Sequence, residues 1–492
     1  MMIARNAILN LTGHAAPLIA ALFLVPALVT RLGADRFGFL SLAWILVGYF
    51  SLFDLGLGRA LSRLMAKRNN VGSAARLPVL SRSALALTLL LGAAAGALLF
   101  ASAGLVCTRL LNLPATLQGE AVVALRILAL CLPLVTLTAA LRGLLEGGQR
   151  FGWVNAMRIP LGVLTFAAPL AATMISPNLV ALAVSLALVR VVALLAHWVV
   201  CARLYPGLAA IGVPTSGAVR EMLGFGAWLS VSNIVGPILV YLDRFVIGGL
   251  LAVSAVAYYT APYEVITRLW LVPAALTGVL FPAFAASDRV QLLGRYRTGI
   301  KAVLAAIFPI VLGGALFASQ WLEAWLGAEY AHQGARAAQL LCVGVLLNCI
   351  AYLPFTLLQA RGRADLVAKT HLAELPAYLV LLSVTVPAYG IGGAALAWAL
   401  RCAVDAAALF WLAHREILPG VAVLTGPQVM VIVASLGAVV GSIWPGTIEA
   451  RCAYAAIMGC VFAPLIWLVL FDRDDRELAR NPLAWLRRES GA

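Results

Sequence analysis

Long apolar runs separated by short polar segments recur along the whole chain. A helix needs about 20 apolar residues to cross the hydrocarbon core of a bilayer, and most of these runs reach that length. The alternating segments of roughly ten residues that build a membrane barrel are not seen in the sequence. The pattern therefore predicts an all-α polytopic membrane protein with about fourteen transmembrane helices, at 7–30, 38–58, 83–106, 120–141, 152–174, 179–202, 222–249, 253–284, 300–318, 337–358, 371–389, 393–413, 427–444 and 452–471.

Composition excludes the main alternative, a water-soluble globular protein. The 492 residues are 63% hydrophobic and 11% charged, and the mean hydropathy is +0.99. A soluble protein carries about 25% charged residues, which it needs to cover its surface. The predicted spans and their connections use nearly the whole length, so we expect no large catalytic domain outside the membrane.

Cysteine usage and basic stretches add no further chemistry. The eight cysteines are scattered, mostly within predicted helices, and show no metal-ligand spacing. We expect them to be small buried residues rather than ligands or disulfide partners. The sequence therefore predicts no cofactor and no metal site. It also predicts no nucleic-acid partner, because no basic stretch with interleaved aromatic residues stands clear of a span.

Lysine and arginine residues indicate the orientation, because they accumulate on the cytoplasmic side of membrane proteins. If the N-terminus is cytoplasmic, 24 of the 35 basic residues fall on the inner side and five on the outer side. We therefore predict that both termini are cytoplasmic. The net charge of +15 then reflects orientation and an attraction to anionic lipid headgroups. The first apolar run is predicted to be an uncleaved span, because it continues to about Thr30 after a single base.

An internal repeat is visible at an offset of 213 residues. Residues 144–150 (LLEGGQR) match residues 357–363 (LLQARGR). The offset corresponds to six spans, and an even number preserves orientation, so the two halves would be parallel repeats unless the match is a chance similarity of apolar sequences. We predict the following domains: an N-terminal six-helix lobe at 1–205, a C-terminal six-helix lobe at 220–415, two additional helices at 425–471 and a cytoplasmic basic amphipathic tail at 472–492.

Two parallel lobes would enclose a central cleft that can open to either side of the membrane, and arginines inside spans indicate what it holds. A charge at mid-bilayer costs about 2.5–3.5 kcal/mol. In the first lobe Arg126, Arg158 and Arg190 face only Asp54. Arg126 and Arg158 lie near span ends, where snorkelling to the interface is the alternative. Arg190 lies near the middle of its span and is hard to explain without a wet cavity.

The charges of the second lobe, in contrast, have partners close by in sequence. Residues at i and i+4 share a helix face, and adjacent residues can also pair. We predict intramembrane ion pairs, either structural or concerned with ion coupling, at Asp243–Arg244, Glu264–Arg268 and Arg401–Asp405. With Glu374 this lobe has four carboxylates for three arginines. The unpaired positive charge therefore lies in the first lobe.

Surplus guanidinium groups in a wet cleft favour an anionic substrate. Guanidinium suits phosphate because its planar fork can bond two oxygens. At about 4 Å and an effective dielectric constant near 20, one such pair contributes about 4 kcal/mol before desolvation. We therefore predict Arg190, with Arg126 and Arg158, as the residues that bind a phosphate or a similar anion.

Several stretches are similar to one known family. They are 33–42 (GADRFGFLSL), 50–61 (FSLFDLGLGRAL), 257–262 (AYYTAP), 280–282 (LFP) and 325–330 (WLGAEY). Together they resemble the polysaccharide transporter, or oligosaccharide flippase, family of the multidrug/oligosaccharidyl-lipid/polysaccharide (MOP) exporter superfamily. The similarity extends over nearly the whole chain from the first predicted span to the twelfth.

The resemblance implies a bacterial inner-membrane flippase with a cationic central cavity. Its substrate would be an undecaprenyl-diphosphate-linked repeat unit for lipopolysaccharide or another surface polysaccharide. The partners that it implies are this lipid-linked oligosaccharide, membrane lipids and, as further candidates, the polysaccharide polymerase or chain-length machinery. Coupling to H⁺, to Na⁺ or to the membrane potential stays open, and the candidate carboxylates for ion coupling are Asp54, Asp243, Glu264 and Asp405.

Two rival functions remain open at this point. A cation-coupled multidrug exporter of the same superfamily usually needs a carboxylate in its cavity, whereas the excess charge of the first lobe is positive. A membrane polymerase or glycosyltransferase generally displays charged residues on long outer loops. The longest outer loop here, 319–336, contains Trp321 and Trp325 and is more simply explained as an interfacial anchor.

Overall fold

The structure, a computed structural model, describes residues 2–50, 61, 62, 65, 71–208, 210–213, 236, 238–471 and 476. Its internal contacts divide the chain into two compact units, residues 1–257 and 258–492, and we describe each by itself. The residues that it describes form helices, turns and short loops, and none of them forms a strand. The predicted all-α membrane fold is confirmed.

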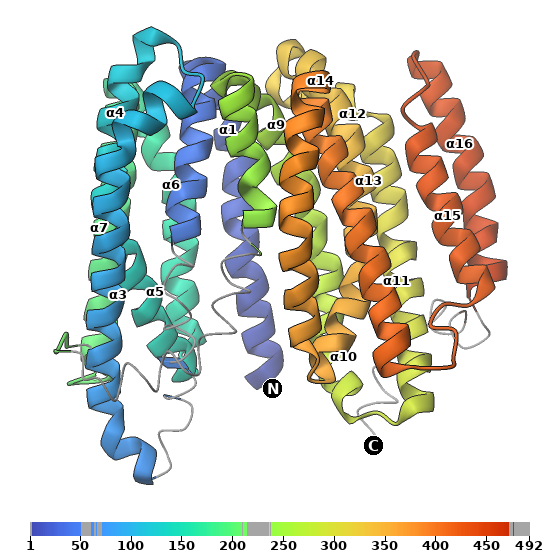
Figure 1. Ribbon diagram of the computed structural model, residues 1–492, viewed down its shortest axis with the longest axis horizontal. Helices are drawn as coiled ribbons and strands as arrows, with labels where there is room; N and C mark the ends of the chain where they lie inside the picture. Colours follow the sequence, from blue (N-terminus) through green and yellow to red (C-terminus); the bar gives the residue numbers. More distant parts are fainter. Residues whose placement is uncertain are drawn as a thin grey trace. The chain divides into compact units, whose positions relative to one another are not determined.

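The first unit consists of long helices that lie roughly along one direction (Figure 1). Their apolar composition and their length reflect the lipid environment predicted from the sequence. In chain order the labelled elements are α1 (Met2–Phe50), α3 (Val71–Leu105), η1 (Val106–Leu110), α4 (Ala115–Leu130), α5 (Leu132–Gly147), α6 (Phe151–Ile175) and α7 (Leu179–Leu204), followed by helical residues 238–250.

The second unit is built in the same way. Helix α9 (Val253–Ile266) begins in the first unit and continues into the second. The other elements are η2 (Thr267–Trp270), α10 (Leu271–Ala286), α11 (Arg289–Leu316), α12 (Ala318–Leu326), α13 (Ala328–Ala360), α14 (Ala364–Leu412), η3 (Ala413–Ile417), α15 (Gly426–Gly441), α16 (Ile448–Pro464) and η4 (Leu465–Leu470).

Ten helices in the described ranges are long and apolar enough to cross a membrane, and α15 is a shorter apolar helix. Helices α1 and α14 each extend over two predicted spans. In each of them a glycine with positive φ interrupts the helix between the two spans: Gly33 in α1, with φ 70°, and Gly390 in α14, with φ 59°. Two predicted spans, 38–58 and 222–249, lie partly outside the described residues. The count of fourteen and the lobe boundaries therefore stay predictions.

A loop of the first unit holds the residues that precede α9. The Asn112 side-chain amide donates hydrogen bonds to the carbonyl oxygens of Gly249, at 2.8 Å, and Leu251, at 3.0 Å. These bonds hold residues 249 and 251 to the first unit, which extends to Ala257.

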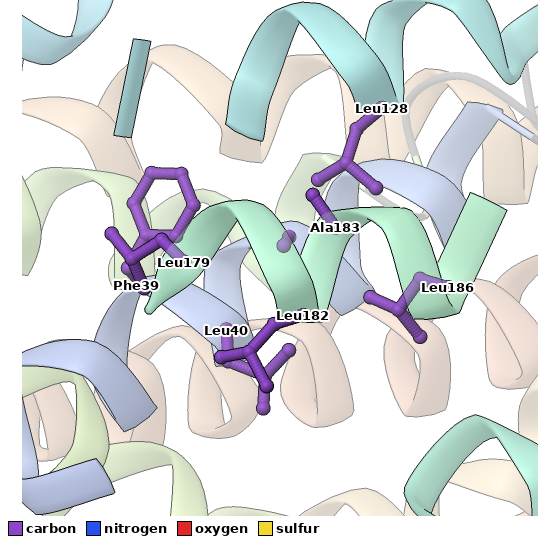
Figure 2. A pocket seen from close by; sticks show the side chains of 8 residues that line it. Phe39, Leu40, Leu128, Leu179, Leu182, Ala183 and Leu186 are labelled. Atoms are coloured by element: carbon purple, nitrogen blue, oxygen red, sulfur yellow. The ribbon is translucent and has the colours of Figure 1, made fainter. Parts of the chain in front are cut away.

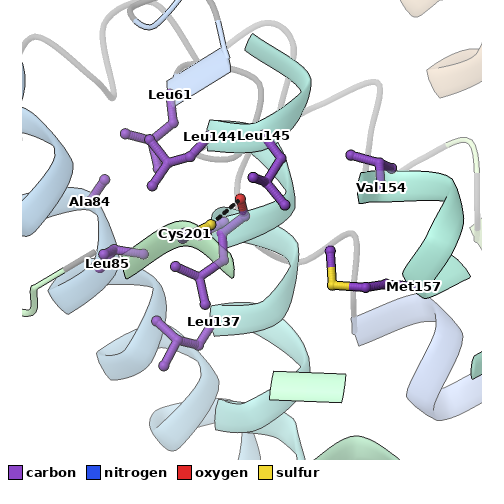
Figure 3. Packing of buried hydrophobic residues seen from close by; sticks show 11 residues of the cluster. Leu61, Ala84, Leu85, Leu137, Leu144, Leu145, Val154, Met157 and Cys201 are labelled. Atoms are coloured by element: carbon purple, nitrogen blue, oxygen red, sulfur yellow. Dashed lines mark hydrogen bonds between the residues drawn. The ribbon is translucent and has the colours of Figure 1, made fainter. Parts of the chain in front are cut away.

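Helices α3, α5, α6 and α7 share a buried apolar cluster that includes Leu85, Leu141 and Leu144 (Figure 3). Cys201 of α7 lies in this cluster, where its thiol donates a hydrogen bond of 3.4 Å to the carbonyl oxygen of Leu141. A buried cysteine of this kind behaves as a small apolar residue. Six of the eight cysteines are buried, and Cys452 and Cys460 are exposed.

The predicted repeat has the same backbone geometry in both units at the 144–150 and 357–363 turns. In the first turn the N–H of Arg150 donates to the carbonyl of Leu145 at 2.8 Å, and in the second the N–H of Arg363 donates to Leu358 at 2.8 Å. The left-handed residue is also at the same place, Gln149 with φ 56° and Gly362 with φ 77°. Each pair is 213 residues apart, so the structure supports the repeat at this turn.

Candidate functional site

Arg190 projects from the face of α7 that packs against α1 and α4. Leu182 and Leu186 of that face line a small apolar pocket with Leu128 of α4 (Figure 2). Arg190 lies one helical turn beyond Leu186, so it continues the same stripe towards the junction of α4 and α5. Its guanidinium lies near Cys131, the residue between these two helices. The apolar packing of α7 thus positions Arg190 beside a helix junction.

The environment of Arg190 supplies no counter-charge within the residues that the structure describes. Arg190 is partly exposed and forms no ion pair there, and its buried Nε has no hydrogen-bond partner among the same residues. An isolated buried charge is costly, and a guanidinium offers five N–H donors. The site can therefore accept an anion at modest cost, because no internal partner has to be displaced.

Arg126 lies on a different face of α4. Arg126 is two residues before Leu128, so the two side chains point about 200° apart around the helix axis. Its guanidinium carbon lies 5.2 Å from the centre of the Phe100 ring of α3, and the side chain is exposed. This is a cation–π contact, which leaves the N–H donors at the edge of the guanidinium free to bind other groups.

Arg158 has a carboxylate partner that the sequence analysis missed. Its Nη2 lies 3.7 Å from Oε1 of Glu146, which also lies 3.6 Å from Nε of Arg142. The expectation that Arg158 faces only Asp54 is wrong, because α5 continues to Gly147 and carries Glu146 to the side of α6. Asp54 itself lies outside the described residues. The structure therefore does not bring Arg126, Arg158 and Arg190 together.

Two of the three predicted ion pairs form as expected. Nη1 of Arg244 lies 3.3 Å from Oδ1 of Asp243, and both side chains are fully buried. Nη2 of Arg268 lies 3.0 Å from Oε2 of Glu264, and both of these side chains are nearly half exposed. An exposed pair contributes little to stability, whereas breaking a buried pair is costly.

The third predicted pair, Arg401–Asp405, is wrong, because Arg401 pairs with a different carboxylate. Nη1 of Arg401 lies 3.4 Å from Oε2 of Glu374, and no Arg401–Asp405 ion pair is present. Asp405 instead lies 3.5 Å from Nε2 of His371. The reason is the interruption of α14 at Gly390, after which the second half of the helix returns alongside the first. Side chains that are 27 residues apart thereby become neighbours, and the i, i+4 rule does not detect them.

Comparison with known proteins agrees with this architecture. A model of the polysaccharide biosynthesis protein family matches residues 3–287. A relative from Shigella flexneri, described as "Putative O-antigen transporter", is 32% identical over 428 residues, which cover 84% of this chain and 98% of the relative.

Solved structures share the fold. The lipid II flippase MurJ in an inward closed conformation has a TM-score of 0.72 at 12% identity, covering 94% of this chain and 99% of MurJ. An inward-facing multidrug resistance transporter of the MATE family, in the MOP superfamily, has a TM-score of 0.66 at 16% identity, covering 86% of this chain and 98% of that protein. These likenesses show the fold alone.

The family resemblance seen in the sequence is confirmed by the family match and by the relative that spans most of the chain. The transporter relative, which covers most of the chain, and the apolar helices also identify the protein as a membrane transporter rather than an enzyme. This chain is a multi-pass membrane transporter that belongs to the polysaccharide biosynthesis protein family.

Proposed function

We propose that this transporter moves an undecaprenyl-diphosphate-linked oligosaccharide from the cytoplasmic to the periplasmic leaflet of a bacterial inner membrane, for O-antigen or a related surface polysaccharide. The O-antigen transporter relative supports this class of substrate. A sugar headgroup and a diphosphate cannot cross hydrocarbon unaided, while a prenyl tail stays in it at no cost. The carrier therefore needs a polar site for the headgroup alone.

The observation that carries the proposal is Arg190, a mid-helix guanidinium without a counter-charge in the described part of the chain. A phosphate at about 4 Å contributes about 4 kcal/mol at an effective dielectric constant near 20, before desolvation. That contribution is comparable to the cost of about 2.5–3.5 kcal/mol for holding the arginine at mid-bilayer. In this proposal the diphosphate is the missing partner of Arg190.

Arg126 and Arg158 have secondary places in the proposed site. Arg158 would have to leave Glu146, which lies 3.7 Å away, before it could bind a phosphate. Arg126 is free of carboxylates among the described residues but lies on the α3 side of α4. We therefore assign the diphosphate contact to Arg190 and expect smaller contributions from the other two.

The proposed orientation places both termini in the cytoplasm, because the basic residues accumulate on that side. Membrane lipids surround the spans, and the polysaccharide polymerase or chain-length machinery would receive the exported repeat unit. Arg476 is described, but the rest of the predicted basic tail at 472–492 lies outside the described residues.

Uptake of a labelled lipid-linked oligosaccharide into inverted membrane vesicles tests the proposal. Arg190→Ala should abolish uptake, and Arg190→Lys should retain part of it, because lysine keeps the charge but loses the bidentate fork. Arg109→Ala, at the exposed end of η1, is the matched control and should transport normally. Normal uptake by Arg190→Ala at wild-type expression would remove Arg190 from the site.

The second candidate is a cation-coupled multidrug exporter, which the shared MATE fold favours. A cationic drug would be repelled by Arg190 and attracted by carboxylates. Drug uptake that persists in Arg190→Ala, together with absent oligosaccharide uptake by the wild type, would establish this alternative.

A further inference from the structure

A cluster of four ionisable side chains lies inside the second unit. His371 and Glu374 belong to the first half of α14, and Arg401 and Asp405 belong to the second half. The two halves pack closely beyond Gly390, because a Cβ at Gly393 would lie 1.9 Å from the carbonyl oxygen of Thr385. The fold therefore encloses these four groups between two antiparallel stretches of one helix.

The charges of this cluster do not balance. Arg401 provides one positive charge, and its Nη1 lies 3.4 Å from Oε2 of Glu374. Asp405 adds a second negative charge, and its Oδ1 lies 3.5 Å from Nε2 of His371, an imidazole that can balance this charge only by binding a proton itself. Glu374 and Asp405 are 7% and 4% exposed. With both carboxylates ionised, a net negative charge would be buried, which is strongly unfavourable.

Two buried carboxylate oxygens point to the missing group. Oε1 of Glu374 and Oδ1 of Asp405 accept no hydrogen bond from any residue that the structure describes. Both carboxyl groups belong to the surroundings of Arg401, which pairs with Glu374 and lies one helical turn before Asp405 on the same face of α14. Two ionised carboxylates can only repel, whereas one proton between them supplies a donor and removes the excess charge.

The other titratable groups around the cluster cannot supply this balance. Tyr378 and Cys402 contact Arg401, and Cys349 of the neighbouring helix α13 faces Cys402, with Tyr352 beside it. All four are neutral at pH 7 in their ordinary state. The ring of Phe355, also from α13, stacks on His371. No other charged group of the described chain faces the cluster, so its neutrality depends on one proton.

We propose that Glu374 and Asp405 share one exchangeable proton, that His371 passes it to and from water, and that its uptake and release accompany transport. His371 is the most exposed member, with 21% of its side chain accessible. A proton from water binds Nε2 of His371 and moves to Asp405, where the new O–H donates to Glu374; release reverses these steps. The coupling part of this inference rests on the proposed function, and the proton site itself does not.

Infrared spectroscopy of the purified full-length protein in detergent tests the proton site without any transport. The wild type at pH 7 should show the carbonyl stretch of one protonated carboxyl group. Glu374→Gln and Asp405→Asn should each remove this band, because the remaining carboxylate is neutralised by Arg401. Glu264→Gln, in the exposed pair with Arg268, is the matched control and should keep it. A wild-type spectrum without the band, a band that survives in both variants, or a band that millimolar sodium removes would overturn the proposal.

Transport in proteoliposomes tests the coupling. A pH gradient should accelerate movement of a lipid-linked oligosaccharide by the wild type at least tenfold, and Asp405→Asn should lose this acceleration while keeping the rate without a gradient. Asp405→Asn retains the Arg401–Glu374 pair and is therefore the safer variant for folding. Acceleration that persists in Asp405→Asn would overturn the coupling. If the wild type moves no oligosaccharide at all, the proposed function fails while the infrared result still stands.

Discussion

Arg190 in α7 and Arg401 in α14 lie at similar places in the two units but in opposite electrostatic settings. Arg190 is eleven residues after the start of α7, and Arg401 is eleven residues after the interruption at Gly390. Arg401 has Glu374 at 3.4 Å, whereas Arg190 has no ion-pair partner within the described ranges. The comparison shows that similar helical positions carry two different arginines: Arg401 is neutralised by a carboxylate, and Arg190 is available to a ligand.

The largest expected effect is on stability. Arg401→Met leaves two buried carboxylates without their cation and should lower the free energy of unfolding by about 3–5 kcal/mol. Arg190→Met removes a charge that has no internal partner and should change this free energy by less than about 1 kcal/mol. Thermal unfolding of the purified variants in detergent measures both. Equal losses would mean that Arg190 has a structural partner like that of Arg401.

A second substitution should give Arg190 a carboxylate neighbour, as Arg401 has in the second unit. Leu194 is partly buried and four residues after Arg190, so Leu194→Glu places a carboxylate on the same face of α7. The new carboxylate competes with an anionic substrate and should lower uptake of lipid-linked oligosaccharide about tenfold, which corresponds to about 1.4 kcal/mol. Leu194→Gln has the same shape without the charge, and it should transport like the wild type. Equal losses in the two variants would attribute the effect to packing.

The smallest expected effect concerns the repeated turn. Gln149 and Gly362 both have positive φ, which costs a non-glycine residue about 1 kcal/mol. Gln149→Gly should therefore raise the free energy of unfolding by about 0.5–1 kcal/mol, and Gly362→Ala should lower it by about 1 kcal/mol. Thermal unfolding with the wild type as reference measures the two shifts. Shifts of the same sign would show that the two turns are not equivalent.

Much of the fold follows from the sequence because lipid imposes strict rules on composition and length. Apolar runs predicted the helices, and the match between the LLEGGQR and LLQARGR segments predicted a repeat, which the structure supports by the turn that both units share there. The lone charge of Arg190 was predicted for the same reason, since a charge within an apolar run has to be explained by a ligand or a partner.

The sequence could not predict contacts that depend on how helices meet. Glu374 and Arg401 are 27 residues apart and become neighbours only because Gly390 turns the helix back. Glu146 was assigned to a connection, although α5 reaches Gly147 and brings Glu146 to Arg158. Helix boundaries predicted from sequence are uncertain by a few residues, and for this reason the sequence did not reveal Glu146 as the partner of Arg158.

Thiol labelling beside Arg190 tests the central claim most directly. Leu194→Cys, which keeps Arg190, is made in a chain whose two exposed cysteines, Cys452 and Cys460, are replaced by serine. A membrane-impermeant maleimide should label position 194 in inverted vesicles, and added lipid-linked oligosaccharide should protect it. Adding Arg190→Ala to this chain should remove the protection. Absence of labelling, or protection that survives Arg190→Ala, would contradict the account of Arg190 as the anion-binding residue.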